Sequence, residues 1–200
     1  MKYKKEAVIA SGNQHKIEEF KQMLEPLGFK VYSMKDLNIK GEVEETGKDF
    51  PSNALLKAKY VENFVKDKIV FADDSGLEIH ALNGFPGIYS HRFMEDRPYK
   101  EKNEAIIEKL KGYENKDANY TCAIALVNFN GKEDKVFVGK TQGKILDKID
   151  GEGGFGYDPI FYSYELNKSF GQATPEEKNS VSHRGKALKQ LMEYIKDNLD

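Results

Sequence analysis

The first residues suited to chemistry lie where a short apolar run gives way to a polar turn. In the stretch IASGNQHKIEEFKQML, Ser11, Gly12 and Asn13 precede an expected helix. Lys16 follows one turn into that helix. Backbone N–H groups at a helix start lack partners and carry the positive end of its dipole, so they can bind a phosphate. A capped helix with Lys16 in water explains the same residues, and the GxxxxGK[ST] pattern of a P-loop is missing.

A second group of candidates is acidic. In FADDSGL, Asp73 and Asp74 are expected to end an apolar strand, where an α/β sheet presents groups to a ligand. Their charges repel, and a divalent cation would relieve that repulsion. Mg²⁺ takes one or two protein carboxylates and completes its shell with water and substrate phosphate. An upstream loop adds Glu42, Glu44 and Glu45. The alternative is a hydrated acidic turn whose side chains bond their own backbone.

A glycine-rich loop carries aromatic residues. It reads GGFGYDPIF, and its glycines favour an unusual backbone shape or a close approach to a ligand. Phe155 and Tyr157 offer flat faces on which a base could stack. Asp158 could accept a hydrogen bond from a base or hold the loop. A mobile hairpin with its aromatic rings folded onto the core is the other interpretation.

Basic residues gather near the C-terminal end, in EEKNSVSHRGKAL. Lys178, His183, Arg184 and Lys186 are expected together at a helix start. Cations at that end oppose the helix dipole, which an anionic ligand would explain. A solvated basic surface is the alternative.

Composition limits the classes of protein to consider. The chain has 200 residues, of which 39% are hydrophobic and 32% charged, and this is typical of a globular domain. A net charge of −2 gives no electrostatic case for binding a nucleic acid polymer. No apolar run is long enough for a membrane helix, and no secretory signal is recognisable. The single cysteine, Cys122, fits a reducing, cytoplasmic location.

The elements that would position these residues follow from hydrophobic spacing. Strands are expected at 5–10 and near 29–33, in KIVFADDSG, and within residues 120–145, where Asn130-Gly131 marks a hairpin turn. Helices are expected at 15–27, 51–66 and 99–111 and from about His183 onward. The order predicts an α/β fold with a mixed sheet flanked by helices.

Taken together, the motifs resemble one family. SGNQHK, EETGKDFPSNALLKAK, FADDSGLEIHALNGFPGIYSHRF, GGFGYDPIF and EEKNSVSHRGKAL resemble, in order, those of the Ham1-like non-canonical purine nucleoside triphosphate pyrophosphatases, also called inosine triphosphate pyrophosphatases. The resemblance implies a single domain over residues 1–200, with an elongated mixed sheet and two lobes around a nucleotide-binding cleft. It also implies a homodimer.

The resemblance further implies an activity. The family cleaves ITP, dITP and XTP to the monophosphate and pyrophosphate with Mg²⁺, which removes deaminated purines from the nucleotide pool. Glu45 and Asp74 match the metal ligands, Asp74 also matches the proton acceptor, and Lys57 matches a lysine of the triphosphate site. The implied substrate-binding residues are Ser11, Gly12, Asn13, Gln14, His15, Lys16, Ser75, Phe155, Gly156, Tyr157, Asp158, Lys178, His183 and Arg184.

Two positions depart from the family pattern. Ser52 replaces a usual Glu, and Gly171-Gln172-Ala173 replaces a segment that commonly carries a Glu, so a carboxylate is lost at each place. Two rival functions remain. A Maf-like pyrimidine triphosphate pyrophosphatase is disfavoured by the GGFGYDP and SHRGKAL motifs. A nucleotide-binding regulator without turnover is disfavoured by intact Glu45, Lys57 and Asp74.

Overall fold

The structure is a computed structural model that describes residues 5–198. Its strands are β1 (Glu6–Ile9), β2 (Lys30–Ser33), β3 (Ile69–Ile79), β4 (Phe85–Pro86), β5 (Asp117–Val127), β6 (Lys135–Ile145), β7 (Phe161–Ser163) and β8 (Lys168–Ser169). Its α-helices are α1 (Gln14–Leu24), α2 (Phe50–Glu62), α3 (Tyr99–Lys109), α4 (Pro175–Val181) and α5 (His183–Asp197). Short 3₁₀ turns include η1 (Glu25–Leu27) and η4 (Asp158–Ile160).

The strands form one eight-stranded mixed sheet. Its order is β2-β1-β3-β5-β6-β7-β8, and β4 pairs with β3 off this path. β1 is parallel to both β2 and β3, whereas the β3–β4, β6–β7 and β7–β8 pairs are antiparallel. The expected α/β fold with a mixed, helix-flanked sheet is therefore confirmed.

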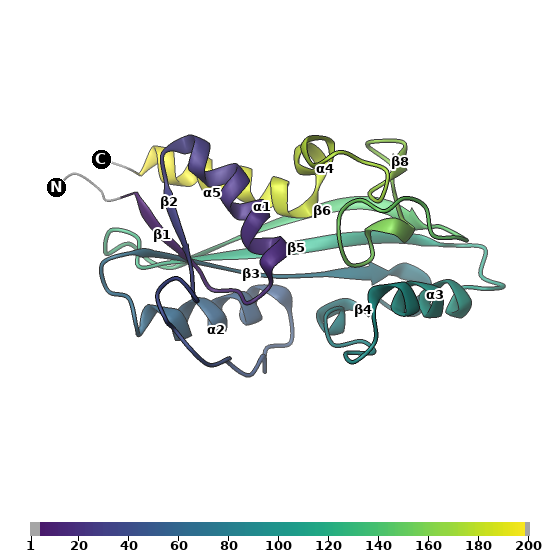
Figure 1. Cartoon of the computed structure of the whole chain (residues 1–200), viewed down its shortest axis with the longest axis horizontal. Helices are drawn as coiled ribbons and strands as arrows, with labels where there is room; N and C mark the ends of the chain where they lie inside the picture. The colour runs from purple at the N-terminus through teal and green to yellow at the C-terminus, as the bar shows by residue number, and fades with distance from the viewer. Residues whose placement is uncertain (1–4, 199–200) are drawn as a thin grey trace. The chain divides into compact units, whose positions relative to one another are not determined.

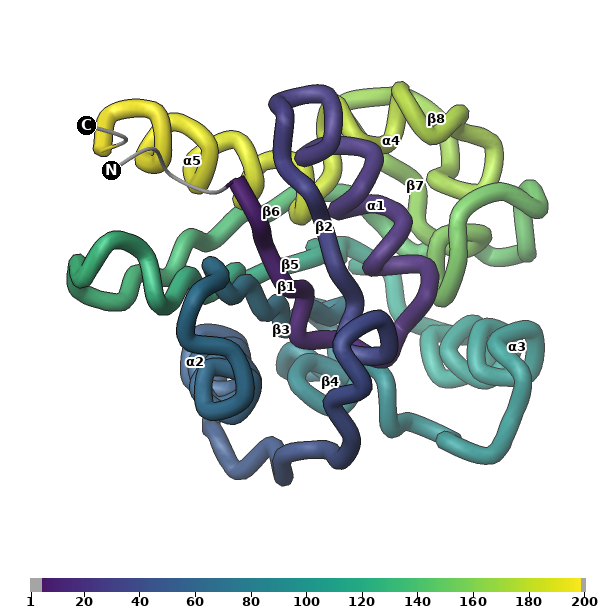
Figure 2. Tube along the Cα trace, turned by 60° about the vertical axis from the view of Figure 1, so that its left-hand side comes forward, coloured from purple at the N-terminus to yellow at the C-terminus, as the bar shows by residue number. Residues whose placement is uncertain are grey.

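The chain divides into two compact units. Of the described residues, the first contains 5–74, 123–138 and 187–198, and the second contains 75–122 and 139–186. In the first unit α1 and α2 lie on opposite faces of the β1–β3 strands (Figures 1 and 2). Helix α1 buries Ile17, Phe20 and Leu24, while α2 buries Ala54, Ala58 and Val61. Both faces of the first strands are thus covered, as their near-continuous apolar runs require.

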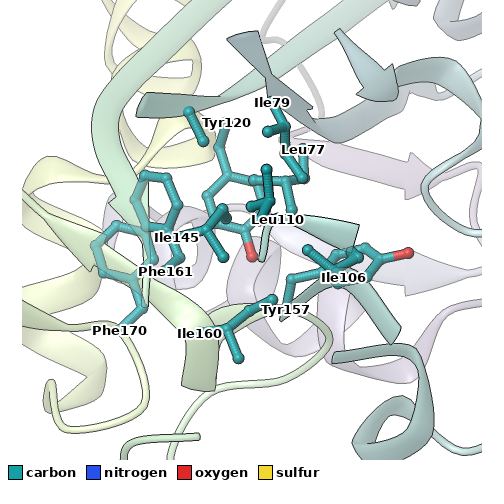
Figure 3. Close-up of a cluster of buried hydrophobic side chains, with 11 residues drawn as sticks. Leu77, Ile79, Ile106, Leu110, Tyr120, Ile145, Tyr157, Ile160, Phe161 and Phe170 are labelled. Carbon is teal, nitrogen blue, oxygen red and sulfur yellow. The ribbon is translucent and has the colours of Figure 1, made fainter. Parts of the chain in front are cut away.

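The second unit has its own aromatic core. Leu77, Ile106, Leu110, Ile145 and Ile160 pack there with aromatic side chains (Figure 3). The aromatic members are Tyr120, Tyr157, Phe161 and Phe170. The Tyr120 ring lies 4.6 Å from Phe161 and 6.0 Å from Phe170, measured between ring centroids. This core underlies the glycine-rich loop, because η4 at the end of the loop supplies Ile160.

One expectation about β3 is wrong. Asp73 and Asp74 do not end the strand, because β3 continues to Ile79. Leu77 and Ile79 are fully buried beyond the acidic pair, and Lys16 and Lys57 lie against the two carboxylates. Burial of the later residues and charge compensation together keep the strand going where the sequence DDSG suggests a turn.

Most other elements agree with their sequence signals. β5 is buried on both faces from residue 118 to 127, as expected for a covered strand. Asn130 and Gly131 both have positive φ, as in a hairpin turn between β5 and β6. Helix α2 ends at Glu62 rather than at residue 66. Helix α5 begins at His183, as expected, but a separate short helix, α4, precedes it.

In the described part of the chain, no helix combines the length and apolarity that a membrane crossing demands.

Candidate active site

The polar turn after β1 is a capped helix start. The Asn13 side chain accepts from the N–H groups of His15 and Lys16, and the Ser11 hydroxyl accepts from the Asn13 N–H at 3.1 Å. A Cβ added to Gly12 would meet no described atom within 4 Å, so in the described part of the chain space is open beside this backbone. The expected cap is therefore present, but Lys16 pairs with Asp73 instead of lying in water, and the open space beside the turn leaves the phosphate interpretation standing. Gln14 instead bonds Glu18 along the helix surface, and His15 is exposed.

Two lysines lie against the acidic pair of β3. Lys16 Nζ is 3.3 Å from Asp73 Oδ2, and Lys57 Nζ is 3.6 Å from Asp74 Oδ1. The same Lys57 ammonium lies 3.2 Å from Glu45 Oε1. These contacts bring α1, α2 and the loop before α2 to the first half of β3. They form a group of mixed charge from residues widely separated in the chain, which we call the lysine–carboxylate cluster.

The sheet explains why this cluster forms where it does. β1 pairs with β3 only as far as Ile9 and Phe71, and the Ala10 N–H donates to the Phe71 carbonyl at 2.8 Å. Asp73 and Asp74 thus follow directly after the carboxyl end of a parallel pair. That position is where open α/β sheets bind ligands.

The loop that carries Glu45 is fastened to α2. Tyr60 donates its hydroxyl to the Lys40 carbonyl at 2.7 Å, and the Gly47 N–H donates to the Asn53 side chain at 2.8 Å. A Cβ on Gly47 would come within 2.5 Å of Asn53 Oδ1, so this close approach requires glycine. Ser52, at the position that departs from the family pattern, is exposed on α2.

Burial alters the protonation of the cluster. Burial raises the pKa of the Asp74 carboxyl above its ordinary value, although Lys57 and Lys16 act in the opposite direction. For Lys57, burial lowers the pKa, but Asp73, Asp74 and Glu45 more than offset it, so the pKa is raised. Lys57 therefore remains a cation at neutral pH, and Asp74 is a carboxylate of increased basicity.

The donor set fits a magnesium ion. Asp74 is 5% exposed, and its Oδ2 is buried with no hydrogen-bond partner among residues 5–198. Glu45 contributes a second carboxylate on the same ammonium. Among residues 5–198, no three His, Cys, Asp or Glu side chains are grouped closely enough to hold a metal by themselves. One or two carboxylates completed by water and phosphate are the usual protein contribution to Mg²⁺.

In the second unit, Asp158 organises the glycine-rich loop. Its Oδ2 accepts from the Phe155 N–H at 2.9 Å and from Lys178 Nζ at 2.8 Å. Its Oδ1 accepts from the Tyr120 hydroxyl at 3.2 Å. Asp158 is 3% exposed, so these donors stabilise a buried carboxylate. Of the two roles that the sequence left open for Asp158, the contacts support holding the loop.

The two aromatic residues of the loop differ. Phe155 is partly exposed, and Lys178 Nζ lies 4.5 Å from the centroid of its ring. Tyr157 is 3% exposed, packs edge-on against Tyr99, and donates its hydroxyl to the Ser90 carbonyl. Because Tyr157 is folded into the core, it offers no free face for a base. Of the two rings, Phe155 therefore remains the candidate on which a base could stack. Between these two residues, the Gly156 carbonyl accepts a hydrogen bond from the Asn103 side chain.

The basic residues do not form a solvated surface. Lys178, His183 and Arg184 are 4%, 5% and 1% exposed. Arg184 donates to the Ser75 hydroxyl at 3.1 Å, and its Cζ lies 5.9 Å from the Phe155 ring centroid. Lys186 leaves the group and pairs with Glu165. We call Phe155, Asp158, Lys178, His183 and Arg184 the aromatic–basic cluster.

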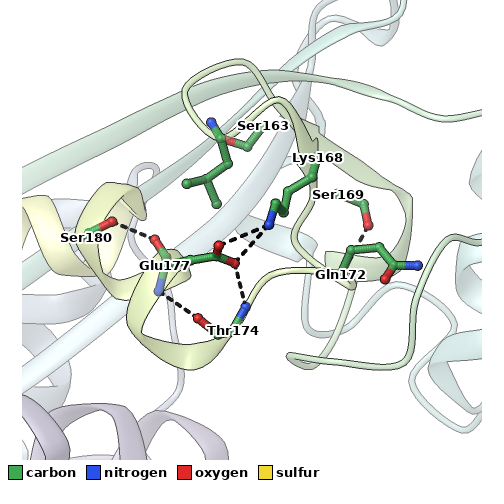
Figure 4. Close-up of polar contacts among 8 residues, drawn as sticks. Ser163, Lys168, Ser169, Gln172, Thr174, Glu177 and Ser180 are labelled. Atoms are coloured by element: carbon green, nitrogen blue, oxygen red, sulfur yellow. Dashed lines mark hydrogen bonds and ion pairs between the residues drawn. The ribbon is translucent and has the colours of Figure 1, made fainter.

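Helix α4 positions Lys178, which does not sit at the start of α5 as expected. Thr174 and Glu177 form a capping box at the start of α4 (Figure 4). Lys168 also pairs with Glu177 at 3.0 Å. Lys178 follows directly after Glu177, so the cap fixes the turn from which its side chain reaches Asp158. Gln172, in the departing segment, bonds Asp150 instead of this cap.

Sequence reasoning missed two contributors to these clusters. Tyr120 lies within an apolar strand pattern, NYTCAIALV, and reads as a core residue. Asn103 lies within an ordinary helix pattern and gave no signal for its contact with the loop. Glu45 was distinguishable from Glu42 and Glu44 only by resemblance, and in the structure its carboxylate pairs with Lys57.

Comparison with known proteins gives a consistent answer. The model of the Ham1 family matches residues 7–194. A protein of Thermoanaerobacter pseudethanolicus named dITP/XTP pyrophosphatase is 43% identical over 196 residues, which cover 96% of this chain and 98% of that protein. A Bacillus subtilis protein of the same name is 43% identical over 194 residues, covering 96% and 97%.

Solved structures agree. The Staphylococcus aureus Ham1 protein has a TM-score of 0.85 and 40% identity, with 96% of this chain and 99% of that chain covered. A dITP/XTP pyrophosphatase of Mycobacterium abscessus has a TM-score of 0.73 and 36% identity, with 94% and 98% covered.

Proposed function

Because this chain belongs to the Ham1 family, we propose that it hydrolyses the non-canonical purine nucleoside triphosphates ITP, dITP and XTP to the nucleoside monophosphate and pyrophosphate. The observation that carries the proposal is the lysine–carboxylate cluster, where Lys57 joins Glu45 and Asp74. Two full-length relatives, each 43% identical, are named dITP/XTP pyrophosphatases, which supports the same activity.

In the proposed reaction, water attacks the α-phosphorus, the bond from that phosphorus to the bridging oxygen breaks, and pyrophosphate leaves. Asp74, whose pKa is raised by burial, accepts the proton of the attacking water. Lys16 and Lys57 neutralise charge that develops on the departing pyrophosphate. The backbone at Gly12, beside which space is open, would bind phosphate oxygens at this helix start.

A magnesium ion is part of the proposal. Glu45 and Asp74 would hold it, and when bound it would supply charge neutralisation and orientation for the phosphates. Lys57 keeps the two carboxylates together before the metal binds. Because Asp74 Oδ2 has no hydrogen-bond partner in the described residues, it is available as a ligand.

The aromatic–basic cluster would bind the purine. The partly exposed Phe155 ring offers a stacking face. Arg184 and His183 are candidate donors to the 6-oxo group that inosine and xanthosine carry where adenosine carries an amino group. A site of such donors rejects an amino group because a buried polar atom is left unpaired, at about 1–3 kcal/mol.

The proposal extends to organisation. The single catalytic domain spans residues 1–200, works as a homodimer and acts in the cytoplasm on free nucleotides, without a nucleic acid polymer or a membrane as partner. A non-hydrolytic nucleotide-binding regulator is the second candidate. The contacts of Lys57 with both Glu45 and Asp74 favour the hydrolase, because a passive sensor has no need of a site for a hydrolytic metal.

The decisive experiment is pyrophosphate release from inosine, xanthosine, adenosine and uridine triphosphates with Mg²⁺. Strong release from the first two and little from the others is expected. Preferred release from uridine triphosphate would favour the pyrimidine-specific alternative. Tight inosine triphosphate binding without release would identify a regulator.

A further inference from the structure

Tyr120 lies beneath the aromatic–basic cluster without belonging to it. It sits in the middle of β5 and is 6% exposed. Its hydroxyl donates to Asp158 Oδ1 at 3.2 Å. Its ring is stacked on the His183 imidazole, with centroids 4.6 Å apart and planes at 11°. One side chain thus contacts two residues of the aromatic–basic cluster.

The hydrogen bond reaches further through Asp158. The other oxygen of that carboxylate accepts from Lys178 and from the Phe155 N–H. A carboxylate bonded at one oxygen only can rotate about its Cβ–Cγ bond, which would loosen both of those contacts. The bond from Tyr120 at Oδ1 opposes this rotation. Tyr120 therefore helps to fix where the Phe155 backbone and the Lys178 ammonium lie.

The hydroxyl has a defined role as donor. Burial raises the pKa of Tyr120 well above its ordinary value, with the Asp158 charge as the next cause. The proton therefore stays on the phenol at neutral pH, so the hydroxyl is the donor in its hydrogen bond with Asp158 Oδ1. Two further rings also pack against the Tyr120 ring: the centroids of Phe161 and Phe170 lie 4.6 and 6.0 Å from its centroid.

We propose that Tyr120 is a positioning residue for purine recognition, which fixes Asp158 through its hydroxyl and His183 through its ring. This inference rests on the proposed function. It assigns to Tyr120 an effect on the binding of the nucleoside part of the substrate, separate from the lysine–carboxylate cluster, in which Tyr120 has no contact in the described residues.

The test is Tyr120→Phe, which removes the hydroxyl and keeps the stacked ring. We expect KM for dITP to rise about tenfold, equivalent to about 1.4 kcal/mol, while kcat stays within about twofold. Inhibition by pyrophosphate should be unchanged, because this product carries no base. Tyr164→Phe is the matched control: it also removes a Tyr–Asp hydrogen bond, to Asp117, at an exposed position. It should leave KM unchanged.

A double-mutant cycle tests the route through Asp158. In an Asp158→Asn background, Tyr120→Phe should change KM by less than about twofold, because the residues act as a unit. An unchanged KM in Tyr120→Phe overturns the inference. So does a tenfold rise that persists in the Asp158→Asn background, or one matched by an equal loss of pyrophosphate inhibition. Wild-type enzyme inactive on dITP would instead overturn the proposed function.

Discussion

Lys57 Nζ lies 3.6 Å from Asp74 Oδ1 while also contacting Glu45, so one ammonium bridges the two carboxylates that would hold a metal in the proposed reaction. Removing either carboxylate leaves Lys57 with a partner. Variants at Glu45 and Asp74 should therefore fold, which makes their kinetic effects interpretable.

Asp74→Asn keeps the side-chain volume but removes charge and basicity. We expect turnover of dITP to fall at least about 100-fold, the lower range for loss of a general base. Asp134→Asn is the control, because it breaks a pair with Lys59 outside the cluster. It should retain wild-type turnover. Near-normal turnover of Asp74→Asn, measured as pyrophosphate release, would exclude Asp74 as the proton acceptor.

The raised pKa of Asp74 predicts a pH-dependent stability. A carboxyl with a higher pKa in the folded state contributes stability that is complete below its ordinary value of 3.8 and is lost as pH rises through the folded value. Asp74→Asn, which does not titrate, should therefore become more stable relative to wild type between pH 4 and pH 7. Urea unfolding without divalent cations measures this. A free energy of unfolding that falls in Asp74→Asn relative to wild type as pH rises would contradict the burial argument.

Glu45→Gln should weaken magnesium binding. Loss of a hydrogen-bond partner of a metal ligand lowers the affinity for the metal about 10–100-fold, so loss of the ligand itself should lower it at least about tenfold. The Mg²⁺ concentration for half-maximal rate should rise accordingly, and the Mg²⁺-dependent increase in Tm should shrink. Glu62→Gln, which removes an i,i+3 pair with Lys59 in helix α2, should alter neither quantity. Equal behaviour of the two variants would remove Glu45 from the metal site.

Arg184→Lys tests base selectivity while avoiding a cavity. Lysine keeps the charge but lacks the planar fork of donors. The ratio of kcat/KM for inosine over adenosine triphosphate should fall at least about fivefold, the equivalent of 1 kcal/mol. Arg97→Lys, at an exposed i,i+4 pair with Glu101, serves as the control and should leave the ratio unchanged. A preserved ratio in Arg184→Lys would take Arg184 out of that role.

Gly154→Ala tests the shape of the glycine-rich loop. Gly154 has φ +66°, and an added Cβ would come within 2.2 Å of Asp158 Oδ2. Gly112, at φ +84°, has nothing within 4 Å. Both variants carry the left-handed strain of about 1–2 kcal/mol, but only Gly154→Ala should raise KM for dITP. Calorimetry and kinetics on the pair separate the two effects, and equal KM values would show that the loop tolerates a displaced Asp158.

Periodicity sufficed for much of the fold. The stripe of Ile17, Phe20 and Leu24 predicted α1, and the doubly apolar pattern of β5 predicted a covered strand. DDSG failed as a turn signal because neutralisation of Asp73 and Asp74 depends on lysines distant in the chain. Local pattern carries no information about such partners.

The candidate site was predictable only in part. Motif resemblance indicated which residues form the site, but their burial and hydrogen-bond partners could be learned only from the three-dimensional structure. Phe155 and Tyr157 look equivalent in sequence, yet one is partly exposed and the other is hydrogen-bonded into the core. Tyr120 was invisible for the opposite reason, since its apolar neighbours in β5 conceal a polar contact made across the second unit.

The continuation of β3 through its acidic pair has a consequence for insertions and deletions. Neighbouring strand residues face opposite sides of a sheet, and here Asp73 meets Lys16 from α1 while Asp74 meets Lys57 from α2. A one-residue insertion or deletion ahead of Asp73 would exchange these sides and present each helix with the wrong side chain. The number of residues in β3 ahead of Asp73 is therefore as constrained as the identity of the acidic pair. Substitutions that keep this number leave each carboxylate on the side of its lysine.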